Sequence, residues 1–286
     1  MIDSTRGIAA MLAAVLVFIF NDALIKLAAE TVPTGQAIGV RGVFATLWCG
    51  LALLASGAWR QISSAIHPRV LLRGGLEASM AMFYLTALFQ IPFAIANAVN
   101  LSGPLMLTTL AVLILKEDVR WRRWTATIAG FAGVLLVIQP HPGDLNGWTW
   151  LVLLATLIGA FRDIVARYLP PSVPTLVVSF TTATTVAVAG CVWALIEGWQ
   201  PMEWRGIGYI VASSLLLAMG YQLLVLALRS GGEISVMASF RYSSILWALG
   251  IGYVVWGEVP NTLALAGIAV IVGAGLYILH RERVRR

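Results

Sequence analysis

The stretch Gly147–Pro170 reads GWTWLVLLATLIGAFRDIVARYLP. Its first part, Trp148 to Phe161, contains no charged residue, and the adjacent Arg162 and Asp163 follow before the apolar run has ended. A charged side chain inside a membrane-spanning helix is costly, and by default it indicates a functional site. This stretch therefore predicts a transmembrane helix that carries a functional pair of charges.

The same pattern occurs 141 positions earlier in the chain. FNDALIK at 20–26 aligns with FRDIVAR at 161–167, and VPT at 32–34 aligns with VPT at 173–175. The agreement continues beyond the end of the predicted helix, so apolar composition alone does not explain it. It predicts a chain built from two related halves.

The composition is that of an integral membrane protein. Hydrophobic residues make up 59% of the 286 residues and charged residues 11%, and the mean hydropathy is +0.87. A soluble domain has about 25% charged residues, and a helix needs about 20 mainly apolar residues to cross a bilayer. Ten spans are expected, at Gly7–Ala29, Thr34–Gly57, Val70–Gln90, Phe93–Leu115, Trp124–Gln139, Trp148–Tyr168, Thr175–Glu197, Gly206–Leu228, Ile234–Trp256 and Thr262–His280.

Lysine and arginine are distributed unevenly among the predicted loops. If the N-terminus is inside, the inside segments hold fourteen of these residues, and the outside segments hold only Lys26 and Arg205. Short cytoplasmic loops carry the excess of positive charge, so both termini are predicted to be cytoplasmic. The inside residues are Arg6, Arg60, Arg69, Arg73, Lys116, Arg120, Arg122, Arg123, Arg167, Arg229, Arg281, Arg283, Arg285 and Arg286.

Each half, 7–140 and 147–280, contains five of the predicted spans within a single membrane domain. Because five is odd, the second half enters the membrane in the opposite sense, which is the inverted-topology repeat of many secondary transporters. Glu117 and Glu258, also 141 positions apart, follow the fourth span of each half. The glycines expected to pack the fifth and tenth spans together are Gly130, Gly133, Gly267, Gly273 and Gly275.

Ten short helices in two halves, the glutamate after each fourth helix and the glycine-rich fifth helix resemble the EamA-type transporters of the drug/metabolite transporter (DMT) superfamily. The likeness covers essentially the whole chain, and within the superfamily the sequence is similar to the YddG-like exporters of aromatic amino acids. The resemblance implies an all-α carrier of the bacterial inner membrane. Together with the polar residues below, it implies alternating access around a cavity built from helices 1, 3, 4, 6, 8 and 9.

Polar residues crowd the fourth predicted span. Asn97 and Asn100 are three residues apart and share a helix face. Pro104, preceded by Ser102 and Gly103, removes a backbone donor, so a kink is expected near Asn100. The two amides are predicted to line a cavity; the alternative is that they only bond a neighbouring helix.

Buried charges are expected to pair within each half of the membrane. Arg241 in the ninth span needs a partner, and Asp163 and Glu77 are the candidates. On the outer side, Asp22 and Arg41 are predicted to form the corresponding pair. These pairs either brace helices or act as gates, and Arg241 alternatively binds a substrate carboxylate.

The third and eighth spans add aromatic residues. Met80, Tyr84 and Tyr221 are expected to form a wall suited to a flat organic solute, with ordinary packing as the alternative. The complete set of candidate cavity residues is Asn21, Glu77, Met80, Tyr84, Asn97, Asn100, Ser102, Arg162, Tyr221, Gln222, Arg241, Tyr242 and Ser244.

These observations favour a secondary transporter of amino acids, aromatic or hydrophobic ones first, and related metabolites. A DMT-type carrier of a nucleotide sugar or cationic drug is the alternative, since Arg162, Arg167 and Arg241 are available for phosphate. A membrane enzyme or assembly subunit is disfavoured, because no nucleotide-binding loop, zinc motif or nucleophile elbow occurs. No cofactor, metal or nucleic acid is expected, and the oligomeric state is left open, a monomer included. Facilitated movement or exchange is favoured over proton coupling through Asp22, Glu77 or Asp163.

Overall fold

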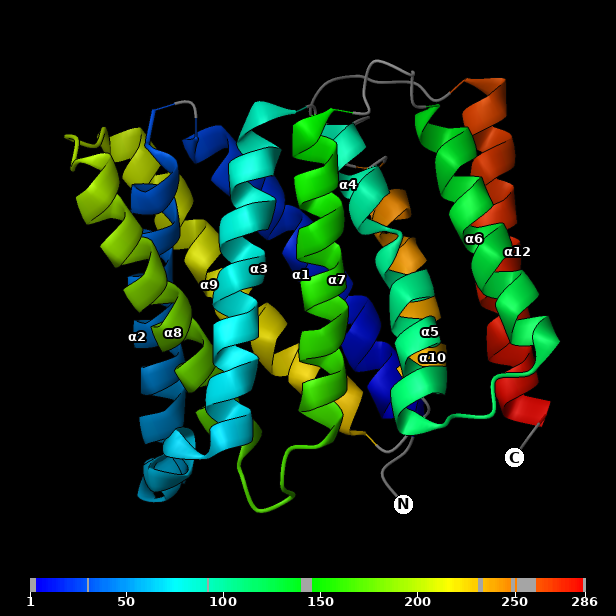
Figure 1. Ribbon diagram of the computed structural model, residues 1–286, viewed down its shortest axis with the longest axis horizontal. Helices are drawn as coiled ribbons and strands as arrows, with labels where there is room; N and C mark the ends of the chain where they lie inside the picture. Colours follow the sequence, from blue (N-terminus) through cyan, green and yellow to red (C-terminus); the bar gives the residue numbers. More distant parts are fainter. Residues whose placement is uncertain are drawn as a thin grey trace.

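The computed structural model describes residues 4–29, 31–91, 93–139, 146–230, 234–247, 250 and 261–284 (Figure 1). These residues form helices and no strand. The helices are α1 Ser4–Ala28, α2 Thr34–Ala55, η1 Ala58–Ile66, α3 Pro68–Gln90, α4 Phe93–Asn100, α5 Gly103–Leu115, α6 Trp121–Ile138, α7 Gly147–Arg167, α8 Thr175–Glu197, α9 Trp204–Arg229, α10 Ile234–Ser239, η3 Phe240–Ser243 and α12 Thr262–Val284.

Five of these helices are clearly long and apolar enough to cross a membrane: α1, α2, α7, α8 and α9. Helix α3 coincides with the third predicted span. Helix α6 begins at Trp121, three residues before the predicted start of the fifth span, so it is longer than expected. The all-helical, multi-pass membrane architecture predicted from composition agrees with this arrangement.

Local sequence signals begin several helices. In the repeated VPT motif, Pro33 and Pro174 occupy the same position, directly before the first residues of α2 and α8. Asn146 caps α7, because its Oδ1 accepts hydrogen bonds from the backbone N–H groups of Trp148 and Thr149 at 3.0 and 3.1 Å. The repeat therefore fixes equivalent helix starts in the two halves of the chain.

The fourth and ninth predicted spans are interrupted. Helix α4 ends at Asn100 and α5 resumes at Gly103, with Pro104 in its first turn, so the predicted kink near Asn100 is confirmed. Helix α10 gives way at Phe240 to the 3-10 turn η3. Beyond residue 247, the ninth predicted span lies outside the described residues except for Gly250, and so does Glu258.

Glycine permits the closest helix contacts. Helix α2 packs along α8, and a Cβ built on Gly190 would lie 2.4 Å from the backbone nitrogen of Gly39. Helices α6 and α12 also pack side by side (Figure 1). There, a Cβ on Gly267 would lie 2.6 Å from the carbonyl oxygen of Gly133. The predicted packing role is confirmed for Gly133 and Gly267.

Two other glycines of the predicted set behave differently. Gly130 faces Tyr242 in η3: a Cβ built on Gly130 would lie 2.7 Å from the tyrosine ring. Gly130 therefore packs α6 against the ninth span and not against α12. Gly273 has no neighbouring atom within 4 Å of such a Cβ, so its assignment to packing was wrong. The side of α12 that carries Gly273 is open. The surroundings of Gly275 lie outside the description.

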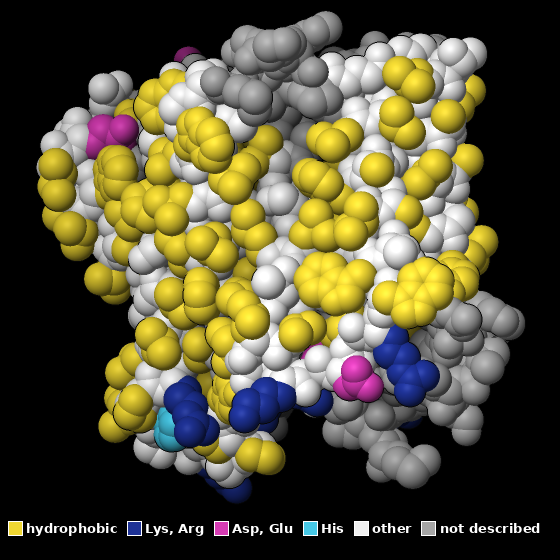
Figure 2. Space-filling model, turned by 45° about the vertical axis from the view of Figure 1, so that its right-hand side comes forward, with side chains coloured by type: hydrophobic (Ala, Val, Ile, Leu, Met, Phe, Trp, Pro, Cys, Tyr) yellow, Lys and Arg dark blue, Asp and Glu magenta, His cyan; other side chains and the backbone are white. Residues whose placement is uncertain are grey.

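Both chain termini lie at the same end of the molecule, together with η1 and the links 116–120 and 168–174 (Figure 1). The space-filling view shows lysine and arginine side chains gathered at this end, below a mainly hydrophobic surface (Figure 2). This separation of a cationic end from an apolar belt is typical of a protein that crosses a bilayer.

Candidate functional site

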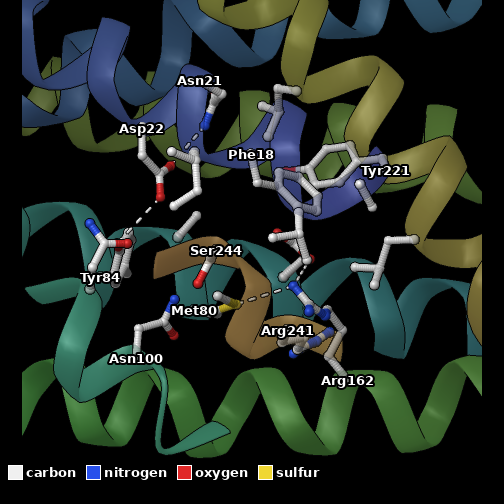
Figure 3. A pocket seen from close by; sticks show the side chains of 18 of the residues that line it. Phe18, Asn21, Asp22, Met80, Tyr84, Asn100, Arg162, Tyr221, Arg241 and Ser244 are labelled. Carbon is white, nitrogen blue, oxygen red and sulfur yellow. Dashed lines mark hydrogen bonds and ion pairs between the residues drawn. The ribbon is translucent and has the colours of Figure 1, made fainter. Parts of the chain in front are cut away.

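A cavity of about 150 Å³ lies between the helices, roughly ten times the minimum that one water molecule requires. Residues of α1, α2, α3, α4, α5, α7, α9 and η3, together with Ser244, line it. Figure 3 shows side chains from these elements converging on one space. The predicted candidates that line the cavity are Asn21, Glu77, Met80, Tyr84, Asn97, Asn100, Arg162, Tyr221, Arg241 and Ser244, with Asp22, Arg41 and Pro104.

Three predicted cavity residues do not line it. The side chain of Gln222 is turned toward α8, where its Oε1 accepts a hydrogen bond from Ser179 Oγ at 3.1 Å. Tyr242 is buried against Gly130 of α6. Ser102 lies in the turn between α4 and α5, with its Oγ buried. The assignments of Ser102, Gln222 and Tyr242 to the cavity are therefore corrected: Gln222 and Tyr242 face neighbouring helices, and Ser102 is not among the residues that line the cavity.

The cavity also has an apolar wall that the sequence did not predict. Met11, Phe18 and Ile19 of α1, among others, line it. The rings of Phe18 and Tyr221 meet edge to face, with centroids 6.3 Å apart and planes at 63° (Figure 3). Apolar residues that face a cavity are indistinguishable by type from those that face lipid, so the sequence offered no signal for them.

The charges near the end of α7 form a buried ion-pair network. Arg162 Nη1 lies 2.5 Å from Glu77 Oε2, and Arg162 Nη2 lies 2.7 Å from Asp163 Oδ1. The other oxygen of Asp163 lies 2.5 Å from Arg241 Nη2. The predicted Asp163–Arg241 pair is confirmed, whereas Glu77 pairs with Arg162. Asp163 itself is fully buried and does not line the cavity.

The outer pair differs from its prediction. No ion pair joins Asp22 to Arg41 among the described residues. Asn21 lies between them: its Nδ2 donates to Asp22 Oδ1 at 2.8 Å, and its Oδ1 accepts from Arg41 Nη1 at 3.4 Å. Tyr84 donates its hydroxyl proton to Asp22 Oδ2 at 3.3 Å (Figure 3). The direct pair was wrong, because the Asn21 amide lies between the two charged groups and bonds to each of them.

Arg73 is a buried cation that sequence reasoning placed in a cytoplasmic segment. It lies in α3, is 0% exposed, and donates from Nη1 to Thr182 Oγ1 of α8 at 2.5 Å. Its Nε and Nη2 have no hydrogen-bond partner. Arg73 precedes Glu77 by one helical turn, and this spacing was the signal that could have placed it on the buried face.

Asn100 combines the two roles considered for it. Its Oδ1 accepts a hydrogen bond from Thr156 Oγ1 of α7 at 3.1 Å, which joins the helices. The side chain also lines the cavity, opposite Tyr84 and Ser244 (Figure 3). The break after Asn100 leaves this part of the span polar, as expected for backbone interruptions that face a cavity in membrane proteins.

The helical fold and the charged central cavity define a class: a multi-pass membrane protein able to hold a small polar solute. Residues 5–139 match the model of the EamA-like transporter family. A crystal structure shares the fold, with a TM-score of 0.78 and 18% identity over 93% of this chain and 96% of that one.

Characterised relatives are also transporters. The S-adenosylmethionine uptake transporter of Rickettsia bellii is 28% identical over 67% of this chain, and the match spans about 65% of that transporter's length. The pseudopaline exporter CntI of Pseudomonas aeruginosa is 25% identical over 92% of this chain and 93% of its own. The riboflavin transporter of Brucella anthropi is 22% identical over 87% of this chain and 91% of its own. Residues 5–139 are thus similar to the EamA-like transporter family, and the chain as a whole is similar to proteins that are named as transporters.

Proposed function

We propose that this protein is a secondary carrier of amino acids and related zwitterionic, ring-bearing metabolites across the bacterial inner membrane. The observation that carries the proposal is the central cavity, in which cationic, carboxylate and amide groups face an aromatic wall. Such a cavity suits a small solute with both charged and flat apolar parts. Its cytoplasmic end is the cationic end that holds both termini.

Alternating access requires two halves that exchange roles, and helix packing supports an inverted repeat with the halves 7–140 and 147–280. In such a repeat, α1 is equivalent to α7, and α3 is equivalent to α9. The symmetry then requires that a contact between α1 and α9 be matched by one between α7 and α3, and the structure has both contacts. The contacts of α3 with α8 and of α9 with α2 form a second such pair. Helices α2 and α8 pack on each other, as elements beside a pseudo-two-fold axis do.

The repeated cations support the same symmetry. Lys26 Nζ donates to the backbone carbonyls of Leu88 and Ile91, at the end of α3, at 3.1 and 2.8 Å. Arg167, its equivalent in the second half, donates from Nη1 to the carbonyl of Leu228, at the end of α9, at 3.3 Å. Each cation therefore holds the C-terminal carbonyls of the equivalent helix in the opposite half.

The substrate class follows from the cavity together with the relatives. One relative is named as an S-adenosylmethionine uptake transporter, and S-adenosylmethionine combines an α-amino acid group with an aromatic ring system. Another is named as a riboflavin transporter, and riboflavin has a flat ring system. The edge-to-face pair Phe18–Tyr221 offers such a ring an apolar surface. Carboxylates and guanidiniums on the other walls match an ammonium and a carboxylate.

Exchange or facilitated movement is the favoured mode of transport. Glu77 and Asp163 are engaged by Arg162 and Arg241. Asp22 is engaged by Asn21 and Tyr84. A proton-coupled mechanism would require one of these contacts to break during the cycle.

The test is counterflow into proteoliposomes that contain the purified protein. Labelled phenylalanine, tryptophan, threonine, S-adenosylmethionine, riboflavin and a quaternary ammonium dye are offered without an ion gradient. Saturable uptake of amino acids or S-adenosylmethionine, with mutual competition, is expected. Uptake of the dye alone would overturn the substrate class, and uptake only after a pH step would overturn gradient-free exchange.

A matched pair of variants links transport to the cavity. Asn100→Ala combined with Arg241→Ala removes two cavity groups and is expected to lower the apparent affinity at least tenfold. Thr109→Ala, on the exposed side of α5, is the control and is expected to retain wild-type uptake. Equal uptake by the double variant and the control would remove the cavity assignment.

A further inference from the structure

Arg41 differs from the other two arginines that line the cavity. Arg162 contacts the carboxylates of Glu77 and Asp163, and Arg241 contacts Asp163. Among the described residues, no carboxylate lies within ion-pair distance of Arg41. Arg41 is nevertheless 3% exposed, so its positive charge is buried beside the cavity with no carboxylate in direct contact, and Asp22 is linked to it only through Asn21.

The hydrogen-bonding capacity of Arg41 is also incompletely used. A guanidinium offers five N–H donors. One donor of Arg41 reaches Asn21 Oδ1 at 3.4 Å, which is a long contact, and its Nε has no partner. A buried charge that lacks a counter-ion is costly and marks a position where an anion would be stabilised. The bound solute is the anion that the cavity can admit.

A second unpartnered donor lies beside Arg41. The hydroxyl of Tyr221 is buried and has no hydrogen-bond partner, and the residue is 1% exposed. Its ring lines the cavity against Phe18 (Figure 3). The charge of Arg41 interacts electrostatically with Tyr221 and, without direct contact, with the carboxylates of Asp22 and Glu77. A buried tyrosine hydroxyl normally finds a partner, so Tyr221 and Arg41 form a pair of unsatisfied donors at one site.

Arg73, the other buried cation without a carboxylate partner among the described residues, does not compete for this role. Arg73 also has unpartnered nitrogens, but it does not line the cavity and is held by Thr182 between α3 and α8. Arg162 already has two carboxylate partners and would have to exchange one of them for a solute. Arg41 is thus the guanidinium that can accept an anion without losing an ion pair.

We propose that Arg41 and Tyr221 form the subsite that binds the carboxylate of the transported solute, which rests on the proposed carrier function. One guanidinium and one hydroxyl match a single negative charge with two acceptor oxygens. A phosphate, which carries nearly two charges, would need a second free cation. With the carboxylate at this subsite, the apolar part of the solute lies against Phe18.

The test measures binding and does not depend on transport. Phenylacetate, phenethylamine and phenyl phosphate are titrated into purified wild-type protein by calorimetry. The wild type is expected to bind phenylacetate most tightly. Arg41→Gln is expected to weaken phenylacetate binding by about tenfold to a hundredfold, as for loss of a charged hydrogen bond. Arg41→Lys should recover part of the loss, and Tyr221→Phe should lose about two- to tenfold.

Arg229→Gln is the matched control, because Arg229 donates to the loop carbonyls of Pro170 and Val173 outside the cavity. It is expected to bind phenylacetate as the wild type does. Undiminished binding by Arg41→Gln, or wild-type preference for phenethylamine or phenyl phosphate, would overturn the subsite. If Arg41→Gln does not fold, the subsite is tested by phenylacetate binding to Arg41→Lys and Tyr221→Phe, and wild-type affinity in both would overturn it. If Arg41→Gln retains counterflow, the carrier function still holds and only the subsite is rejected. If phenylacetate binding depends on Arg41 but the wild type shows no counterflow, only the carrier function is rejected.

Discussion

Asp163 Oδ2 lies 2.5 Å from Arg241 Nη2, which joins the last part of α7 to the turn η3 where the ninth span is interrupted. Asp163 is fully buried and also binds Arg162 through its other oxygen, so one carboxylate contacts two guanidiniums, and Glu77 supplies the second negative charge of the network. The side chain of Arg241 is 20% exposed toward the cavity. The irregular backbone of η3 is therefore held at the cavity wall by an ion pair with α7 of the same half of the chain.

Removing the charge of Asp163 should destabilise the protein strongly. Asp163→Asn leaves Arg241 without a carboxylate and Arg162 with only Glu77. Breaking a buried ion pair in this way typically costs about 3–5 kcal/mol. The measurement is unfolding of the purified protein in mixed detergent micelles, followed by circular dichroism. Asp118→Asn, at an exposed position in the 116–120 link, is the control and should change stability little. Equal stability of the two variants would contradict the network.

The contact of Lys26 with the end of α3 should also be measurable. Lys26→Met removes both hydrogen bonds to the carbonyls of Leu88 and Ile91, leaving them without these partners. The expected loss is about 1–3 kcal/mol. Lys116→Met makes the same substitution at an exposed site and serves as the control in the same unfolding assay. A loss no greater than that of the control would show that the carbonyls find water instead.

The sequence predicted the larger features of this fold because they depend on periodic or repeated patterns. The helical spans, the interruption at Asn100 and the pairing of Asp163 with Arg241 all followed from hydropathy, Pro104 and the repeat. The prediction of a direct contact between Asp22 and Arg41 was wrong, because that contact depends on side-chain rotamers, which the sequence does not show. Asn21 is adjacent to Asp22 in sequence, yet it bridges to another helix.

The residues that were missed share a different physical reason. Arg73 lies near the start of α3, and only its spacing of one helical turn from Glu77 indicated that it faces protein rather than the cytoplasm. Phe18 is one apolar residue among many on α1, and its place on the cavity depends on how α1 and α9 cross. Crossing geometry is a property of the whole assembly of helices, so local patterns do not contain it.

The contact between α2 and α8 leaves no room for a side chain at Gly190. The added methyl group of Gly190→Ala would lie 2.4 Å from the nitrogen of Gly39, and backbone atoms cannot move aside as a flexible side chain does. Overpacking of this kind costs about 1–3 kcal/mol. Gly75→Ala, on an open face of α3, is the matched control and should be neutral or stabilise by about 1 kcal/mol through helix propensity. Thermal unfolding compares the two, and equal destabilisation would mean that helix propensity, and not the crossing, sets the effect.

The cationic end of the molecule is predicted to face the cytoplasm, and cysteine labelling in cells tests this orientation. Ser63 lies exposed in η1, at the end that holds both termini, and Glu203 is exposed at the opposite end, before α9. Single cysteines are placed at these sites in a background with Cys49 and Cys191 replaced by alanine.

Because short loops rich in lysine and arginine stay inside, a membrane-impermeant maleimide should label Glu203→Cys in intact cells. Ser63→Cys should be labelled only after the membrane is permeabilised. The reverse pattern would place the termini outside. Labelling of both sites in intact cells would mean that the chain is inserted in two orientations, so the excess of positive charge at one end would not direct insertion.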